Sequence, residues 1–224
     1  MPSRILAVGD IHGCTAALVA ALAAADPQPD DLVVTLGDYV DRGPDSRGTI
    51  DYLIDLATRC TLVPLLGNHD WMVLELAGGD LAPFADWLSY GGDATLASYD
   101  CTSPEEFPPA HLDFLRGCRL FHETNRHFFV HGSYIKELPL TEQPEEVILW
   151  DALRYRLPGQ HCSKKTAIVG HTAQRSGDVL DLGYLKCVDT WVYGHGWLTV
   201  LDVENGHVWQ ADKEGNLREP EMPS

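Results

Sequence analysis

The sequence predicts an α/β protein in which helices pack on a largely parallel sheet, and the order of its elements carries this prediction. Its N-terminal part has three apolar runs typical of buried strands, at 5–8, 32–36 and 61–66. Helical patterns at 16–25 and 46–59 separate these runs. Parallel strands need a crossover of helix length between them, so this alternation favours strand-helix-strand units.

The sequence pattern changes in the middle of the chain, and more strand-like segments follow after that. Residues 72–119 read as helical fragments broken by pairs of glycine and proline, with no strong strand pattern. Strand patterns then return at 127–130, 166–169, 184–188, 198–203 and 207–210. We expect one domain, 1–224, in which 72–119 is a helical insertion beside the site and 212–224 is a loosely held polar tail.

The charge balance restricts the partners that the protein can bind. Sixteen lysines and arginines stand against 33 acidic residues, a formal net charge of −17. So acidic a surface repels nucleic acids and anionic membranes, because binding to either depends on lysine and arginine. We therefore expect neither partner, and any phosphate-bearing substrate must be held by a few local cations or by metal ions.

The cysteines and the N-terminus favour a cytoplasmic protein. The six cysteines are scattered without a C-x-x-C pair, which is typical of reduced thiols packed as small apolar side chains. No apolar run reaches the length of a membrane span, and the N-terminus leads into a short strand rather than a signal sequence.

Candidate ligands follow five of the predicted strands. Each of the five apolar runs ends in glycine or histidine beside a side chain with an oxygen or imidazole ligand. In an open α/β sheet the carboxyl ends of the strands line the ligand crevice, so these segments can converge. The candidate set is Asp10, His12, Asp38, Asn68, His131 and His171.

This mixture of carboxylate, amide and imidazole groups suits a borderline divalent metal: manganese, with iron or zinc as alternatives. Six ligand residues are too many for one catalytic ion that keeps open positions. They fit two ions that share a bridging carboxylate. Each motif alone is weak evidence, because Gly-Asp and Gly-His pairs are common in turns, and their shared placement at strand ends gives the prediction its weight.

The same segments, in order, resemble the signature of the metal-dependent phosphoprotein phosphatase family, specifically its compact bacterial serine/threonine phosphatases. The resemblance covers roughly residues 4–203. The segments that carry it are Gly9-Asp10-Ile11-His12-Gly13, Gly37-Asp38-Tyr39-Val40-Asp41-Arg42-Gly43, Gly67-Asn68-His69-Asp70, His131-Gly132 and Gly170-His171. It implies the α+β calcineurin-like metallophosphoesterase fold: two packed mixed β-sheets flanked by helices, a four-layer α/β/β/α sandwich.

The resemblance also implies a division of labour between two metal ions. Asp10 and His12 would hold the first ion, and Asp38 would bridge both. Asn68, His131 and His171 would hold the second ion. A hydroxide between the metals would attack phosphorus in line.

Three more residues would act on the substrate in such an enzyme. His69 would be the general acid that protonates the leaving oxygen, with Asp41 as its carboxylate partner. Arg42 would bind the phosphate oxygens, assisted by Asn68. The expected substrate is a phosphoprotein or a small phosphomonoester, with phosphoserine and phosphothreonine favoured and phosphotyrosine also considered.

The chain departs from the family pattern at three places. Asp70 stands where glutamate is usual after the Asn-His pair. A second phosphate-binding arginine often lies two positions after a Leu-Trp pair, but Ala152 stands at that place after Leu149-Trp150, which leaves Arg154 or Arg156 as substitutes. Trp191 stands where small residues are usual, and its effect on the site is open.

Three other functions are compatible with parts of the sequence pattern. A hydrolase of symmetrical dinucleoside polyphosphates is the nearest, because Asp70 is common in those enzymes, although they usually lack the second aspartate that Asp41 supplies. A phosphodiesterase or nuclease typically ends in Gly-His-x-His, whereas Ala173 occupies the last position here. A binding module that has lost its chemistry should lack a ligand or the acid, and none is missing.

Overall fold

The computed structural model describes residues 2–219 and places eleven strands in two sheets. In the first sheet the strand order is β11-β10-β1-β2-β3, and β9 pairs with β10. Its strands are β1 (Ile5–Val8), β2 (Leu32–Thr35), β3 (Thr61–Pro64), β9 (Asp189–Thr190), β10 (Trp197–Asp202) and β11 (Val208–Ala211). β1, β2 and β3 are parallel, whereas β10 runs antiparallel to β1.

The second sheet has the order β4-β5-β6-β8-β7. Its strands are β4 (Phe121–Glu123), β5 (His127–Val130), β6 (Thr166–Val169), β7 (Leu180–Asp181) and β8 (Leu185–Cys187). The three inner strands are parallel, and the two edge strands are antiparallel to their neighbours. Both sheets are therefore mixed, as the family resemblance implied.

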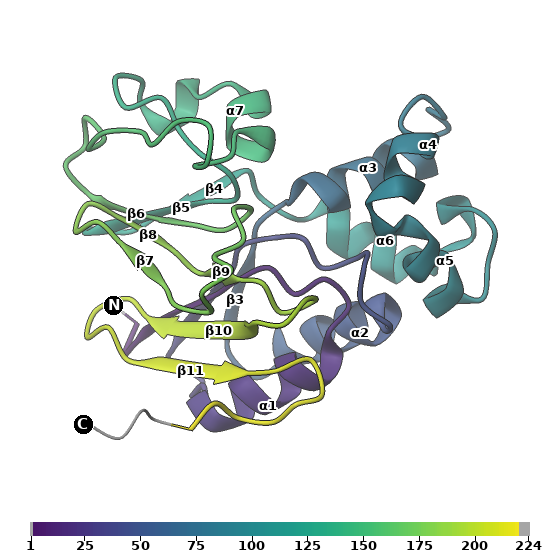
Figure 1. Ribbon diagram of the computed structural model, residues 1–224, viewed down its shortest axis with the longest axis horizontal. Helices are drawn as coiled ribbons and strands as arrows, with labels where there is room; N and C mark the ends of the chain where they lie inside the picture. The colour runs from purple at the N-terminus through teal and green to yellow at the C-terminus, as the bar shows by residue number, and fades with distance from the viewer. Residues whose placement is uncertain (1, 220–224) are drawn as a thin grey trace.

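Alternating side chains of the first sheet bury two different faces. Leu6 and Val8 pack with α1 (Thr15–Ala25) and α2 (Ser46–Leu56), whereas Ile5 and Ala7 face the second sheet. The outer face of the second sheet packs against α7 (Glu145–Trp150). Figure 1 shows these layers, with α1 and α2 below the first sheet and α7 beyond the second. The four-layer α/β/β/α arrangement is confirmed.

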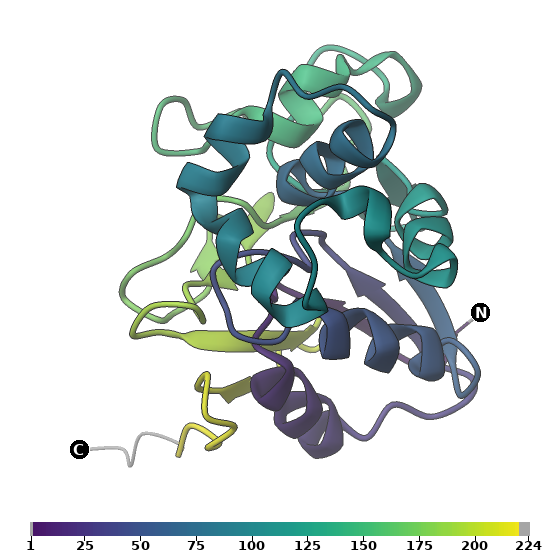
Figure 2. The same ribbon diagram turned by 90° about the vertical axis from the view of Figure 1, so that its right-hand side faces the viewer.

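A group of helices lies beside both sheets, to the right in Figure 1 and facing the viewer in Figure 2. It contains the predicted helical region, and its first helix begins at Asn68, four residues before 72, because the ligand motif itself forms the first turn. The group consists of α3 (Asn68–Ala77), α4 (Phe84–Trp87), the π-helical η1 (Leu88–Gly92), α5 (Asp93–Tyr99), η2 (Pro104–Glu106) and α6 (Pro109–Arg116). A further short turn, η3 (Leu140–Glu142), precedes α7.

Most predicted strands and helices lie where the pattern placed them, and the differences have simple causes. The helix expected at 46–59 ends at Leu56, after which the chain turns. β4, β7 and β9 have only two or three residues each and are too short for a period-two pattern. No helix within residues 2–219 is long and apolar enough to cross a bilayer.

The start of the expected loose tail is tied to the fold. Asp212 accepts hydrogen bonds from the amides of Glu214 and Asn216. Arg218 donates to the carbonyl of Gly177 and to Gln210. Arg218 thus joins this stretch to the rest of the fold, whereas residues 220–224 of the predicted tail lie outside the described part of the chain.

Candidate active site

The site begins with Asp38, which lies between the two sheets at the carboxyl end of β2. It is buried, and its backbone is left-handed with φ 52°. Asp70 holds this loop, because its carboxylate accepts hydrogen bonds from the amides of Asp38 (2.7 Å) and Tyr39 (2.9 Å). The loop also meets the start of α3 at Gly67, where a Cβ atom would lie 2.2 Å from the Asp38 nitrogen. Asp70 thus has a clear structural role here.

Two imidazoles approach Asp38 from opposite sides. His12 Nε2 lies 3.4 Å from Asp38 Oδ2, and His131 Nε2 lies 3.4 Å from Asp38 Oδ1. In each ring Nδ1 donates to a backbone carbonyl, that of Val40 (2.9 Å) for His12 and that of Leu36 (2.7 Å) for His131. These bonds leave the Nε2 lone pairs directed at the carboxylate, which is the arrangement that orients histidine as a metal ligand.

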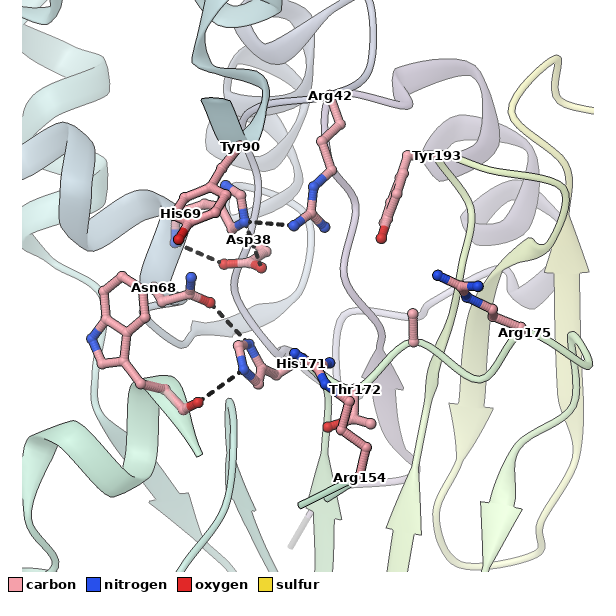
Figure 3. A pocket seen from close by; sticks show the side chains of 12 residues that line it. Asp38, Arg42, Asn68, His69, Tyr90, Arg154, His171, Thr172, Arg175 and Tyr193 are labelled. Atoms are coloured by element: carbon pink, nitrogen blue, oxygen red, sulfur yellow. Dashed lines mark hydrogen bonds and ion pairs between the residues drawn. The ribbon is translucent and has the colours of Figure 1, made fainter. Parts of the chain in front are cut away.

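Asn68 and His171 lie next to His131 and add further possible ligands there. Asn68 Oδ1 lies 3.0 Å from His131 Nε2 and 3.0 Å from His171 Nδ1. His171 Nε2 donates to the carbonyl of Trp150 over 3.2 Å, so its Nδ1 also presents a lone pair (Figure 3). Oxygen and nitrogen lone pairs therefore face one another here, and a cation is the partner that satisfies them.

Burial keeps these imidazoles neutral. Desolvation lowers the pKa of His12 and of His131 below the ordinary value for histidine. The same cause lowers the pKa of His171 to about 3. Neutral imidazole is the form that binds metal.

The donors fall into two groups that share Asp38, namely His12 with His69 and His131 with His171. In each group the ligand atoms lie within 4.8 Å of one another. One carboxylate between two sets of nitrogen donors is the geometry that a pair of divalent ions requires. The residues present therefore fit a dinuclear centre.

Asp10 lies at the edge of this arrangement. Both of its carboxylate oxygens accept the backbone N–H of His171, at 3.1 and 2.9 Å. Among residues 2–219, the two donor groups do not include Asp10, so its role as a ligand stays a prediction. Asp189 is buried near it, and burial raises the pKa of Asp189 to about 7 and also raises that of Asp10.

His69 is held by a separate network. Its Nδ1 donates to Asp41 Oδ2 over 2.6 Å, while Trp87 Nε1 (3.0 Å) and Thr95 Oγ1 (2.7 Å) donate to Asp41 Oδ1. Burial raises the pKa of Asp41, and the bonds from His69 and Thr95 act against this rise. With Nδ1 bound, the ring turns Nε2 towards the cavity, 4.0 Å from Asp38 Oδ2.

Arg42 reaches into the same space from the loop after β2. Its two terminal nitrogens donate to His12 Nε2 (2.7 Å) and His69 Nε2 (2.9 Å). Its guanidinium stacks 4.4 Å from the centre of the Tyr193 ring. The backbone is left-handed at Arg42, as it is at His12, Asp38, Asp41 and His171, so unfavourable conformations gather at the site loops.

A cavity of about 520 Å³ is lined by five of the predicted site residues, namely Asp38, Arg42, Asn68, His69 and His171 (Figure 3). The sequence left open whether Arg154 or Arg156 replaces the second phosphate-binding arginine. Arg154 lines this cavity, whereas Arg156 lines a different one. Besides predicted residues, its lining contains Tyr90, Trp150, Thr172, Ala173, Arg175 and Tyr193.

Sequence reasoning missed several of these residues. Trp87 is buried in the hydrophobic core and its indole N–H also binds Asp41, while Trp150 packs against the core and also lines the cavity. Thr95 carries no recognisable motif. For Arg175 there was one signal: it follows the Gly170-His171 pair by four residues in a chain poor in basic residues.

The model of the calcineurin-like phosphoesterase family matches residues 3–196. Serine/threonine-protein phosphatase 1 of Salmonella typhimurium is 38% identical over 92 residues, which are 40% of this chain and 39% of that protein. A symmetrical bis(5'-nucleosyl)-tetraphosphatase of Nitrosomonas europaea is 30% identical over 130 residues, which are 58% of this chain and 44% of that protein. The matched part thus covers less than half of either relative.

Solved structures share the fold. A putative diadenosine tetraphosphatase aligns with a TM-score of 0.69 at 22% identity, over 94% of this chain and 95% of its own. The cold-active protein-tyrosine phosphatase of a Shewanella species aligns with a TM-score of 0.70 at 19% identity, over 97% of this chain and 80% of its own. With the family match covering most of the sequence and the donor groups in place, the chain belongs to the calcineurin-like phosphoesterase family.

Proposed function

We propose that this protein is a dinuclear-metal phosphomonoesterase that hydrolyses phosphoserine and phosphothreonine in proteins. The observation that carries the proposal is the 2.6 Å bond between His69 Nδ1 and Asp41 Oδ2. A serine or threonine alkoxide is a poor leaving group and needs a proton, whereas a nucleoside diphosphate leaves with little help. A buried acid with its own carboxylate partner is suited to the harder of these two reactions.

His69 has the geometry of a general acid. Asp41 holds Nδ1 of His69, so Nε2, which faces the cavity and accepts from Arg42 here, is the atom that would carry a proton to the leaving oxygen. Trp87 and Thr95 hold the other oxygen of Asp41, so the carboxylate cannot rotate away from the ring without losing two hydrogen bonds. His69 Nε2 is thereby fixed for transfer to the leaving oxygen.

Asp38, His12, Asn68, His131 and His171 would hold two divalent ions, for which we favour manganese with iron or zinc as alternatives, and Asp10 would add a ligand. When bound, the ions would neutralise the phosphate oxygens and lower the pKa of a water molecule. Arg42 would bind two phosphate oxygens, since its forked guanidinium already lies between His12 and His69. Asn68 and Arg154 are further candidates for phosphate contact.

Hydrolysis of symmetrical dinucleoside polyphosphates is the second candidate. Several curated relatives carry that name, including one of Yersinia pestis that is 45% identical over 74 residues, which are 32% of this chain and 25% of that protein. The fold is also shared with a putative diadenosine tetraphosphatase. Both candidates use the same metal pair, and they differ in their need for the pair of His69 and Asp41.

The test compares leaving groups in the variant His69→Asn. The variant should lose ~10²-fold or more in kcat on phosphoserine peptide and far less on an activated aryl phosphate, because only the poor leaving group needs an acid. His207→Asn, in the exposed turn before β11, is the matched control. Equal losses on both substrates would contradict the acid role.

A direct comparison of substrates tests the choice between the two candidates. Protein reconstituted with manganese is offered a phosphoserine peptide, a phosphotyrosine peptide and diadenosine tetraphosphate side by side. We expect the phosphoserine peptide to be hydrolysed with the highest kcat/KM. Exclusive hydrolysis of the dinucleotide would overturn the proposal in favour of the second candidate.

A further inference from the structure

We propose that Arg175, supported by Trp191, forms a second anion-binding subsite that binds a negatively charged group of the substrate beyond the scissile phosphate. The inference rests on the proposed function and deepens it, because it assigns the preferred substrates to those that carry at least two anionic groups. For a protein substrate, the second group is an acidic or phosphorylated residue next to the phosphoserine.

The first observation is that Arg175 forms no ion pair with a carboxylate of residues 2–219. It is exposed and lines the same cavity as Arg42. In the part of the chain that the structure describes, no ion pair joins Arg175 to an aspartate or glutamate. In a protein with 33 acidic and 16 basic residues, partners for a surface arginine are abundant. An arginine kept apart from them at the site leaves its charge to an anionic ligand.

The second observation is that aromatic side chains hold Arg175 in place. Its guanidinium carbon lies 5.1 Å from the centre of the Trp191 ring, and Trp191 lies edge-on to Tyr193 at 6.4 Å. Tyr193 in turn stacks under Arg42 at 4.4 Å. Figure 3 shows Tyr193 between Arg42 and Arg175, so the two guanidinium groups lie along one wall of the cavity.

The third observation is that Trp191 is itself fixed by its surroundings. Its backbone is left-handed with φ 67°, and its N–H donates to Asp189 over 3.0 Å. The ring lies directly against Gly194, where a Cβ atom would come within 2.3 Å of Trp191 Cε2. This fit accounts for a bulky tryptophan in the loop before Gly194: it is the platform on which Arg175 rests.

The size of the cavity also favours a substrate larger than one phosphate. A volume of about 520 Å³ is typical of sites that enclose a drug-sized ligand. Arg154 lines the same cavity and, like Arg175, forms no ion pair with a carboxylate among residues 2–219. The cavity thus offers cationic groups beyond Arg42, which the reacting phosphate alone does not require.

The experiment compares Arg175→Gln with Arg156→Gln, which removes the same charge from a neighbouring cavity. Four substrates are used: p-nitrophenyl phosphate, a phosphoserine peptide with alanine neighbours, the same peptide with aspartate neighbours, and diadenosine tetraphosphate. For Arg175→Gln we expect kcat/KM on the aspartate peptide to fall about fivefold relative to the aryl phosphate, through KM rather than kcat. Added salt should reduce the difference between wild type and variant.

Variants of the supporting tryptophan separate positioning from general damage. Trp191→Ala should produce the same selective rise in KM, whereas Trp191→Phe should retain most of the preference because a ring remains under the guanidinium. An equal loss on all four substrates, or no selective loss relative to Arg156→Gln, would overturn the subsite.

The subsite and the proposed function can fail separately. If the wild type hydrolyses only diadenosine tetraphosphate, the protein-phosphatase proposal falls. If Arg175→Gln lowers kcat/KM on that substrate more than on the aryl phosphate, the subsite would still be supported. The second anion would then be supplied by the phosphate chain. Absence of that loss would overturn the subsite as well.

Discussion

The two halves of the site are built differently, although each supplies imidazoles to Asp38. The half that follows β1 and β2 has left-handed backbone at His12, Asp38, Asp41 and Arg42, and further hydrogen bonds tie it to the helical group. The half that follows β5 and β6 orients His131 and His171 through backbone carbonyls, with Asn68 between the rings, and of these two histidines His171 has left-handed backbone.

The residues that we propose to act on the scissile phosphate and its leaving group lie in the first half. Near Asp38 the second half orients lone pairs, which is sufficient for holding an ion. The first half also presents the arginine and the histidine-aspartate pair that we propose to act on the phosphate and its leaving group. Its unfavourable backbone conformations are the cost of aiming several side chains from one short loop.

Asp38→Asn should have the largest effect, because this residue belongs to both halves. We expect activity on p-nitrophenyl phosphate to fall by ~10³-fold or more, since bound metal supplies several kcal/mol of stabilisation. Metal content after reconstitution with manganese, measured by mass spectrometry, should fall below two ions per chain. An active variant with two bound ions would show that the halves do not depend on a shared carboxylate.

His131→Gln should damage the second half alone. We expect the affinity for one of the two ions to weaken by ~10²-fold, at the upper end of the losses seen when even an indirect partner of a ligand is removed. Titration of metal-free protein with manganese should show one tight and one weakened site, and excess manganese should restore part of the activity. Loss of both ions together would contradict the separation of the halves.

Asp41→Asn should damage the first half without loss of metal. The turnover of phosphoserine peptide should fall by ~10²-fold, because an amide does not stabilise the protonated imidazole of His69. Metal content measured on the same sample should match the wild type. Loss of metal would mean that Asp41 supports the ligands rather than the acid.

Trp87→Phe tests whether the helical group supports the first half. Removing the indole N–H deprives Asp41 Oδ1 of one of two donors, and we expect a loss of about tenfold in kcat on phosphoserine peptide. Trp209→Phe, on β11, is the matched control. An unchanged kcat with a lowered melting temperature would assign Trp87 a purely structural role.

Asp31 offers a comparison away from the site. It pairs with Arg4 at 2.6 Å, and although burial opposes ionisation, the bonds from Arg4 and from the amide of Gln28 lower the pKa of Asp31. A lowered folded-state pKa stabilises the protein above the unfolded value of about 3.9, and this stability is lost as pH falls through the folded value. Asp31→Asn should therefore cost about 1–2 kcal/mol at pH 7 and less below pH 4, measured by urea unfolding, with little change in kcat.

Much of the fold and the centre of the site could be predicted because their signals are local. The runs at β1, β5 and β6 coincide with the predicted strands, and each is followed within two residues by a candidate ligand. Trp87, Thr95 and Arg175 carry no such signal, because their roles depend on how helices and loops pack around Asp41 and Trp191. Asp10 has the local signal, but its position after a strand does not determine the direction of its carboxylate, which binds the amide of His171.

The bonds from Trp87 and Thr95 to Asp41 have a consequence for engineering and for evolution. Tyr90, which lines the cavity, lies between these two residues in the sequence, so the wall of the pocket and the support of Asp41 belong to one continuous segment. This segment is not an exchangeable module. A chimaera that takes it from a relative must also carry an indole and a hydroxyl at these two places, or it will change substrate range and reaction rate together.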